Sequence, residues 1–374
     1  MTTYLDCNAT TPIATEVIDI VNKYLKEEFG NSGSRTHEFG VVAKQAVEKA
    51  RQLVADVVDA DKSEVIFTSG ATESNNIAIL GLKEYAQQSQ KLHIISSKIE
   101  HKAVLEPLAE LEKIGFSVTY LPTDESGLIH KEDLAAALKD DTVLVSIMQV
   151  NNETGCLQDI EGFCDVLANH DAYFHVDAAQ GFGKYENGLA NQRVDMISVS
   201  GHKLYAPKGI GALITRRRGF QKIPLKPLMF GGGQERGLRP GTLAVPLIAG
   251  LGKACELVKE NREQWASHCK KLQDLAISSL SVLDIQINGE NLAPHVLNFS
   301  IPGMNSEAAI VALKGIIAVS NGSACTSSSY SPSHVLLAMG LDEERIDSAI
   351  RMSWCYMTSE LPTQKIIEVL RRYL

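Results

Sequence analysis

Lys203 and Asp177 are the residues of this sequence whose types and surroundings most directly suggest chemistry. Lys203 follows a short apolar run in the segment Ser-Gly-His-Lys, and Asp177 ends another β-like run upstream of it. A lysine amine can form a Schiff base with an aldehyde, and a carboxylate can keep a pyridine nitrogen protonated so that the ring withdraws electrons. The pair therefore predicts a pyridoxal phosphate (PLP) site, although Asp and Lys at strand ends are also common loop residues.

A third feature, upstream of both residues, has the composition of a phosphate-binding turn. Residues 68–74 (TSGATES) follow the β-like run 65–67 and begin a helix that we expect over 73–85. Small residues let the backbone come close to a phosphate, and the N–H groups of a first helical turn can donate hydrogen bonds to it. The alternative is a Ser/Thr helix cap without a ligand. Together and in this chain order, the turn, the acid and the lysine indicate a PLP site more specifically than any one of them does alone.

The overall composition excludes several classes of protein. The chain has 374 residues, of which 44% are hydrophobic and 22% charged, enough for one large domain and a smaller one. Its formal charge of −9 gives no general attraction to nucleic acid or to an anionic membrane, so we expect neither as a direct partner. Apolar runs such as 143–147 are far shorter than the roughly 20 residues of a membrane span. The basic cluster 216–218 is expected to lie in a solvated loop.

The cysteines favour a reducing compartment. There are seven, an odd number, scattered along the chain without a Cys-x-x-Cys pair, which argues against a disulfide framework and against a zinc ribbon. The sequence contains neither a Walker A motif nor His-Glu-x-x-His, and we predict no metal site. The N-terminus lacks the charged and then apolar leader of a signal peptide. We therefore expect a cytoplasmic protein with mostly buried thiols.

Short β-branched runs alternate with helix-period segments over more than half of the chain. Seven strands are predicted, at residues 64–68, 92–96, 118–121, 142–148, 173–176, 196–199 and 210–215. Helices are expected between some of them, at 103–114 and 131–138. This alternation predicts an α/β fold with a large, mainly parallel, seven-stranded sheet covered on both faces. Ligands of such sheets bind beyond the carboxyl ends of the strands. The residues that fall there are Ala71, His101, Asn152, Asp177 and His202.

A second region begins after the glycine-rich stretch 231–237. Two helices, 245–260 and 262–280, are expected to lead into strands near 285–288 and 296–300, which predicts a smaller α+β domain. The predicted division is 15–245 for the large domain, and 1–14 with 246–374 for the small one. Residues 320–332, which include Cys325, are too polar and too rich in small residues for a core, and we expect a mobile loop.

Taken in order, these motifs resemble those of the NifS/IscS type of cysteine desulfurase. That family is a branch of the class-V aminotransferases, whose PLP-dependent fold is similar to that of aspartate aminotransferase. The matching stretches cover nearly the whole chain: 4–6 with 9–12, 70–74, 100–102, 151–155, 176–180, 200–203, 231–242 and 322–327. Eight ordered motifs are too many to arise by chance.

The resemblance assigns roles to individual residues. Lys203 forms the Schiff base with PLP, Asp177 pairs with the ring nitrogen, and His101 stacks on the ring and moves protons. Arg351 clamps the substrate carboxylate, a task that suits its planar, two-pronged donor. The remaining implied contacts are from Gln180 and Asn152 to the phenolic oxygen or the substrate, from Ala71, Thr72, Ser200 and His202 to the phosphate, and from Thr242 to the phosphate of a second subunit.

The reaction implied by the resemblance transfers the sulfur of L-cysteine to Cys325 as a persulfide and releases L-alanine. A free thiol has a pKa of roughly 8.5, so Cys325 needs help from its surroundings to ionise at neutral pH. The implied partners are L-cysteine, a second copy of the chain in a homodimer, and a sulfur-acceptor protein. The acceptor could serve iron-sulfur cluster assembly or a dedicated pathway such as DNA phosphorothioation or tRNA thiolation.

Two other functions stay open at this point. One is a PLP-dependent C–S or C–Se lyase, or an aminotransferase, that does not use Cys325. The other is a non-catalytic docking platform, which the presence of the lysine, the acid and the cysteine argues against. The sequence departs from the family pattern at Cys7, where relatives often carry an aromatic residue, and at Cys355, where a glycine is more usual. All six cysteines other than Cys325 are expected to be structural.

Overall fold

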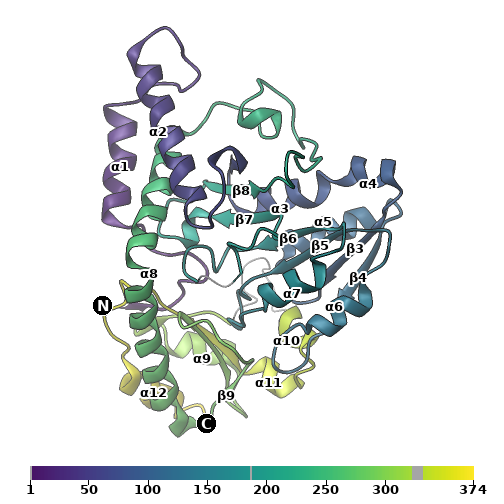
Figure 1. Cartoon of the computed structure of the whole chain (residues 1–374). Helices are drawn as coiled ribbons and strands as arrows, with labels where there is room; N and C mark the ends of the chain where they lie inside the picture. The colour runs from purple at the N-terminus through teal and green to yellow at the C-terminus, as the bar shows by residue number, and fades with distance from the viewer. Residues whose placement is uncertain (1, 186–187, 322–331) are drawn as a thin grey trace.

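A seven-stranded sheet lies at the centre of the structure, a computed structural model that describes residues 2–185, 188–321 and 332–374 (Figure 1). Its strands, in spatial order, are β2 (Val65–Thr68), β8 (Gly211–Thr215), β7 (Met196–Ser200), β6 (Tyr173–Asp177), β5 (Thr142–Met148), β3 (His93–Ser97) and β4 (Ser117–Leu121). All neighbours are parallel except β8, which is antiparallel to β2 and to β7. The predicted α/β fold and its mainly parallel sheet are confirmed.

Helices cover both faces of this sheet, which explains why its central strands are almost entirely buried and mainly apolar. All seven residues of β5 are buried. Val145 and Ile147 belong to one apolar cluster, together with residues of α2 (Glu38–Ala55), α7 (Ile160–Leu167) and α8 (Val245–Leu280). Leu144 points the other way, into a cluster formed with α3 (Ala71–Leu80) and α5 (Lys102–Glu112). Alternate side chains of a strand face opposite sides, so both faces of β5 must be apolar.

The helix expected at 73–85 is two helices. α3 ends at Leu80, and α4 (Lys83–Ser89) begins after a turn at Gly81. A Cβ atom at Gly81 would lie 2.3 Å from the carbonyl oxygen of Ile77, so the turn requires a glycine there. The helices expected at 103–114 and 131–138 correspond to α5 and to α6 (Lys131–Ala137).

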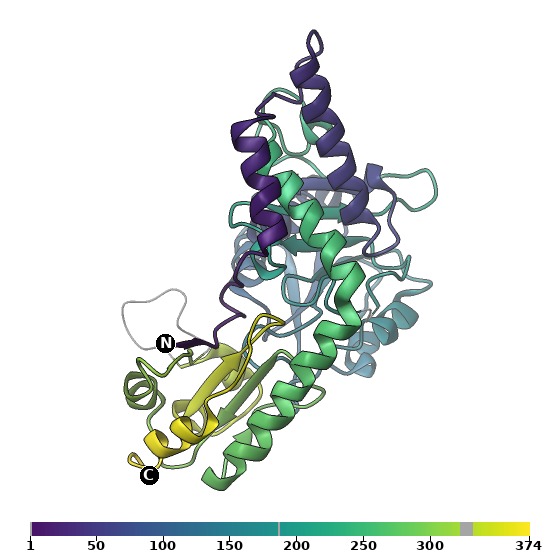
Figure 2. The same ribbon diagram turned by 90° about the vertical axis from the view of Figure 1, so that its left-hand side faces the viewer.

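α8 is a single helix of 36 residues, and the expectation of two helices at 245–260 and 262–280 was wrong (Figure 2). Its first half packs against α1 (Thr15–Lys26) and α2, and its second half carries apolar residues of the smaller unit. The polar stretch between the halves contains neither glycine nor proline, so nothing ends the helix. Among the described residues, no helix is long and apolar enough to cross a membrane.

A smaller α+β unit, as predicted, packs below the large sheet in Figure 1. Its three-stranded antiparallel sheet has the order β12 (Ala349–Ser353), β10 (Val296–Ser300), β9 (Gln286–Ile287), and a separate parallel pair joins β1 (Thr3–Tyr4) to β11 (Ile317–Ala318). Its other helices are α9 (Ser306–Ala312) and α12 (Thr363–Leu370). The short helices α10 (His334–Ala338) and α11 (Glu343–Asp347) contribute apolar residues to the core of the large unit. The division at 14/15 and 245/246 stays a prediction, because α8 contributes to the cores of both units.

Only part of the basic cluster 216–218 is solvated as expected, because Arg217 is exposed whereas Arg216 is buried and Arg218 is half-buried. Arg216 is buried, and its guanidinium donates to four backbone carbonyls, among them those of Val194 at 3.0 Å and Leu189 at 2.8 Å. Arg218 forms an ion pair with Asp195 at 2.7 Å. Guanidinium groups can be buried where enough acceptors surround them, and here they tie β8 to the segment before β7.

Candidate active site

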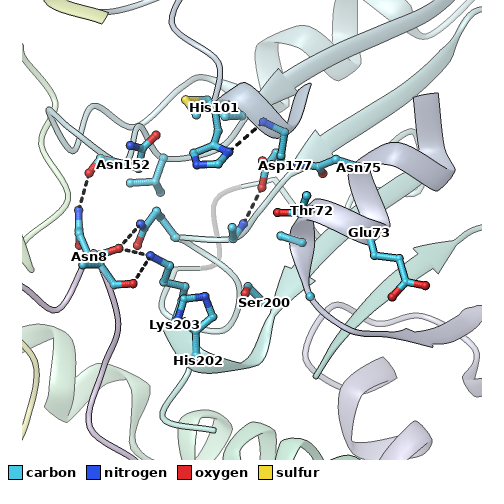
Figure 3. Close-up of a pocket in the computed structure, with 18 of the residues that line it drawn as sticks. Asn8, Thr72, Glu73, Asn75, His101, Asn152, Asp177, Ser200, His202 and Lys203 are labelled. Atoms are coloured by element: carbon cyan, nitrogen blue, oxygen red, sulfur yellow. Dashed lines mark hydrogen bonds between the residues drawn. The ribbon is translucent and has the colours of Figure 1, made fainter. Parts of the chain in front are cut away.

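A cavity of about 490 Å³ lies at the carboxyl ends of the parallel strands (Figure 3), a volume typical of a small-molecule site. It gathers ten of the twelve predicted site residues: Ala71, Thr72, His101, Asn152, Asp177, Gln180, Ser200, His202, Lys203 and Arg351. Nine of them come from the last residues of strands of the large sheet or from the loops and helix starts that follow these strands. Arg351 comes from β12 of the smaller unit, so the cavity lies between the two units.

Asp177, the last residue of β6, is buried at the cavity wall and firmly oriented. Its Oδ2 accepts a hydrogen bond from Asn75 Nδ2 at 2.7 Å, and its Oδ1 accepts one from the backbone N–H of Ala179 at 3.0 Å. Asn75 was not predicted. Its side-chain amide is fully buried on α3 among apolar residues, and a buried amide needs a hydrogen-bond partner. This burial marks Asn75 as a residue with a specific role.

Lys203 ends the short 3₁₀ turn Gly201–Lys203 that follows β7, and its amine reaches into the cavity. The Nζ donates to the backbone carbonyl of Asn8 and, at 2.8 Å, to that of Ala9. Gln180 Nε2 donates to the same Asn8 carbonyl at 2.9 Å. The segment 8–9 from the N-terminus therefore holds the lysine. Sequence reasoning missed Asn8, because it acts through its backbone and across a long sequence separation.

The start of α3 forms a cradle suited to an anion. Gly70, the residue before the helix, has a φ of 154°, a conformation that side chains rarely adopt. The first N–H groups of α3 point out of the helix, and Ala71 and Thr72 line the cavity there. Lys208 lines the same cavity and adds positive charge. Burial, together with nearby lysines, lowers the pKa of His202 to about 4, so this imidazole is neutral near pH 7.

His101 caps the start of α5 and presents its ring to the cavity (Figure 3). Its Nδ1 accepts a hydrogen bond from the backbone N–H of Ala103 at 3.0 Å, which leaves Nε2 as the nitrogen that carries the proton of the neutral ring. Burial lowers the pKa of His101, and the positive charge of Lys203 acts in the same direction. The ring is therefore neutral near pH 7, a form that can both accept and donate a proton.

Arg351 is almost fully buried but has an unused donor. Its Nη2 forms an ion pair with Asp6 Oδ1 at 2.7 Å, and its Nη1 donates to the backbone carbonyl of Asn152 at 2.9 Å. Within the described residues, its Nε has no hydrogen-bond partner. A buried guanidinium with a free N–H edge, on a cavity wall, is arranged to receive a further anion such as a carboxylate.

Two predicted site residues are not among those that line the cavity. Thr242 is exposed and lines a separate hollow beside Glu235. Cys325 lies outside the described residues. The described segments on either side of it bond to residues at or beside the cavity wall. The backbone N–H of Arg351 donates to the Ser320 carbonyl at 2.7 Å, and Ser333 Oγ donates to Glu153, the neighbour of Asn152, at 2.5 Å.

Comparison with known proteins agrees with this geometry. A model of the family described as aminotransferase class-V matches residues 3–361. The chain belongs to the class-V aminotransferase family. One class-V relative, the cysteine desulfurase IscS of Neisseria meningitidis serogroup C, is 45% identical over 371 residues, which cover 98% of this chain and 91% of the relative.

Solved structures extend the class-V similarity to three dimensions. A NifS-like protein superposes with a TM-score of 0.91 and 37% identity, over 100% of both chains. SspA in complex with cysteine superposes with a TM-score of 0.84 and 38% identity, over 94% of this chain and 98% of the SspA chain. The fold predicted from sequence, that of PLP-dependent transferases, is thereby confirmed.

Class-V aminotransferases depend on PLP, and the cavity fits this cofactor. An oriented carboxylate, a lysine amine and an anion cradle at a helix start match its ring nitrogen, its aldehyde and its phosphate. Asn8, Asn75 and Gln180 line the cavity, and their buried side-chain oxygens accept no hydrogen bond from any described residue. Unsatisfied buried oxygens at one cavity are consistent with a ligand that carries donors. Over the described parts of the chain, no cluster of three or more His, Cys, Asp or Glu residues could hold a metal ion.

Proposed function

We propose that this chain is a PLP-dependent cysteine desulfurase that removes the sulfur of L-cysteine, giving L-alanine and a persulfide on Cys325. The observation that carries the proposal is the meeting of Lys203, Asp177 and His101 from the large unit with Arg351 from the smaller one at a single cavity. The similarity to IscS and to SspA in complex with cysteine supports this choice of substrate.

The residues of the cavity would hold the cofactor and the substrate in one orientation. Asp177 would bind the ring nitrogen, and Ala71, Thr72, Ser200 and His202 would bind the phosphate. Bound PLP supplies an electron sink for the α-carbon of an amino acid. Arg351 would bind the substrate carboxylate through its Nε, which lacks a partner among the described residues. Asn152 and Gln180, which also line the cavity, would contact the substrate or the ring oxygen.

Proton transfer would fall to Lys203 and His101, since both present nitrogen atoms to the cavity. The Lys203 amine, once deprotonated, can accept the proton of the substrate α-carbon and return one. The neutral His101 ring holds a proton at Nε2, because its Nδ1 is occupied by the backbone N–H of Ala103. It can therefore donate to a leaving or developing negative charge without first being protonated.

Sulfur transfer would use Cys325. The thiolate attacks the substrate sulfur, an S–S bond forms as the C–S bond breaks, and the electrons of that bond pass to the carbon, which takes a proton and leaves as alanine. Supporting this, the segments on either side of Cys325 contact Arg351 and Glu153, the neighbour of Asn152. The persulfide would then pass to an acceptor protein, in iron-sulfur cluster assembly or in a dedicated pathway such as DNA phosphorothioation or tRNA thiolation.

The protein is further proposed to be a cytoplasmic homodimer in which Thr242 contacts the cofactor phosphate of the second subunit. Thr242 is exposed and follows a segment that is anchored by the buried ion pair between Arg51 and Glu235, with an N–O distance of 2.6 Å. Phe230, 89% exposed, lies in the same segment. An anchored surface segment with an exposed aromatic side chain suits a contact between subunits. Sedimentation of the purified protein as a monomer with full activity would contradict this.

The function is tested by incubating the purified protein with PLP and L-cysteine and measuring alanine and sulfide. Equal amounts of alanine and released sulfur are expected with a thiol present, and the Cys325→Ala variant should form neither while still binding PLP. Turnover of cysteine by that variant would favour a lyase that does not use Cys325. Absence of PLP binding would leave only a non-catalytic role.

A further inference from the structure

Cys7 and Cys355, which lie near opposite ends of the chain, meet behind the substrate-facing wall of the cavity. Asp6 and Ser353 form a parallel β-bridge, and the backbone N–H of Cys7 donates to the Ser353 carbonyl at 3.1 Å. The two cysteine side chains hydrogen-bond to one another, and each is only 2% exposed. Two cysteines from opposite ends of the chain therefore form a single contact.

The surroundings of the pair favour a thiolate on Cys355. Its sulfur accepts hydrogen bonds from the Cys7 thiol, from the backbone N–H of Met357 and from the Thr358 hydroxyl, and these lower the pKa of Cys355 although burial opposes them. Lys184 adds a positive charge nearby, and burial lowers the pKa of this lysine itself to about 8. The hydrogen bond and burial raise the pKa of Cys7, which remains the thiol. One thiolate beside one thiol is the reactive state of a cysteine pair.

The other buried cysteines lack these features. Burial raises the pKa of Cys164 to about 12, and it also raises the pKa values of Cys156 and Cys255. Among the six cysteines that the structure describes, Cys355 is the one whose pKa is lowered. An apolar packing role does not require a thiolate with three donors. The arrangement is therefore more than the filling of core space.

We propose that Cys7 and Cys355 are a site of reversible oxidation, at which a peroxide converts the two thiols into an intramolecular disulfide. The Cys355 thiolate attacks one oxygen of hydrogen peroxide, the O–O bond breaks, and hydroxide leaves with a sulfenic acid on Cys355. The Cys7 thiol then attacks that sulfur, an S–S bond forms, and water leaves. Two thiols and one peroxide give one disulfide and two waters, and an external dithiol reverses the change.

The position of the pair gives the oxidation a consequence for the cavity, and this part rests on the proposed function. Asp6 precedes Cys7 and holds Arg351 through its ion pair, while Asn8 follows Cys7 and holds Lys203 through its carbonyl. Disulfide sulfurs lie much closer than hydrogen-bonded thiols, so the bond must draw the Cys7 and Cys355 segments together. We infer that oxidation displaces Asp6 and weakens the binding of an amino-acid carboxylate at Arg351.

The oxidation itself is tested in the Cys325→Ser variant, where the loop thiol cannot compete. The reduced PLP-bound protein is treated with a small excess of hydrogen peroxide, the remaining thiols are alkylated, and peptides are mapped by mass spectrometry. A linked peptide pair containing Cys7 and Cys355 is expected, which dithiothreitol should remove. Adding Cys7→Ser should abolish the link, and adding Cys156→Ser should leave it unchanged. Recovery of Cys7 and Cys355 both fully alkylated, or linked to other cysteines, overturns the proposal.

The consequence is tested by titrating the same protein with L-cysteine and following the cofactor absorbance. Oxidised protein should bind L-cysteine about tenfold or more weakly than reduced protein, and dithiothreitol should restore binding. The Cys325→Ser protein with Cys7→Ser should bind equally before and after peroxide. A mapped link with unchanged cysteine binding overturns the coupling to Arg351. Reduced protein that binds PLP but no cysteine contradicts the proposed function instead, and the mapping result stands independently of it.

Discussion

Replacement of Arg351 by glutamine tests the arrangement of the cavity most directly. Glutamine keeps a similar length but removes the charge and the fork of donors. In the structure Nη1 and Nη2 already have partners in Asn152 and Asp6, so a substrate carboxylate should bind chiefly at the Nε edge. Hydrogen bonds to charged groups contribute about 1.5–3 kcal/mol, which corresponds to a loss of about 10- to 150-fold in affinity for L-cysteine.

The loss should be seen mainly in KM. Arg351 is expected to contact the carboxylate, which does not change during the reaction, and removal of such uniform binding raises KM more than it lowers kcat. Steady-state rates of alanine formation over a range of L-cysteine concentrations give both constants. Cysteamine, which has the thiol and amine but no carboxylate, should bind to the Arg351→Gln variant and to the unmodified protein with the same affinity.

Stability must be measured in parallel, because Arg351 also pairs with Asp6. The Asp6 side chain is 21% exposed and can be rehydrated, so the loss should be about 1–3 kcal/mol. Arg345→Gln is the matched control: Arg345 bonds to Asn288 at 2.8 Å and does not line the cavity. A KM for L-cysteine within about twofold of the original in folded, PLP-bound Arg351→Gln protein would refute the assignment of the carboxylate to this residue.

Three further substitutions probe residues that support the site or the fold. Asn75→Leu removes a hydrogen-bond donor from Asp177 and should weaken PLP binding by about tenfold or more. The affinity is measured by titrating the apoprotein with PLP, and an unchanged affinity would show that this hydrogen bond does not matter for the cofactor. Burial raises the pKa of Glu100 from 4.5 to about 8, so folding takes up a proton between these pH values and the native state loses stability as the pH rises through them. The free energy of unfolding of the Glu100→Gln variant, measured in urea, should therefore rise relative to that of the unmodified protein by up to about 4 kcal/mol between about pH 5 and about pH 9. A difference that stays constant with pH would contradict the raised pKa. Arg216→Gln leaves four carbonyls without their donor and should lower the free energy of unfolding by about 3 kcal/mol or more. The control Arg217→Gln, which makes the same change in charge at an exposed position, should lower it by less than about 1 kcal/mol. Equal losses in the two variants would contradict the buried role of Arg216.

The strands and the strand-end residues could be predicted because both depend on local sequence. A parallel strand buried on two faces must be mostly apolar, as β5 is apart from Thr142 and Ser146. Polar residues that follow such strands meet at one edge of the sheet. His101 and Asp177 come together for this reason. The polar middle of α8 suggests a boundary between two helices, but it contains neither glycine nor proline. The helix continues through it because its two halves pack on different units.

Contacts across long sequence separations account for most of what the sequence did not predict. Asn75 is recognised only by its partner Asp177, 102 positions away, and Asn8 acts through a carbonyl that any residue would carry. Arg216 looks like part of a solvated cluster, but the carbonyls that satisfy it come from separate turns of the chain. The contact of Cys7 with Cys355 belongs to the same class, since neither position suggests a partner in the other.

The N-terminal segment links the parts of the cavity that come from the two units. Asp6 holds Arg351 of the smaller unit, while the carbonyls of Asn8 and Ala9 hold Lys203 of the larger one. A change in this segment must therefore act on Arg351 and on Lys203 at the same time, because only two peptide bonds separate Asp6 from Asn8. This explains how a modification at a position outside the cavity wall can alter substrate binding without touching the substrate.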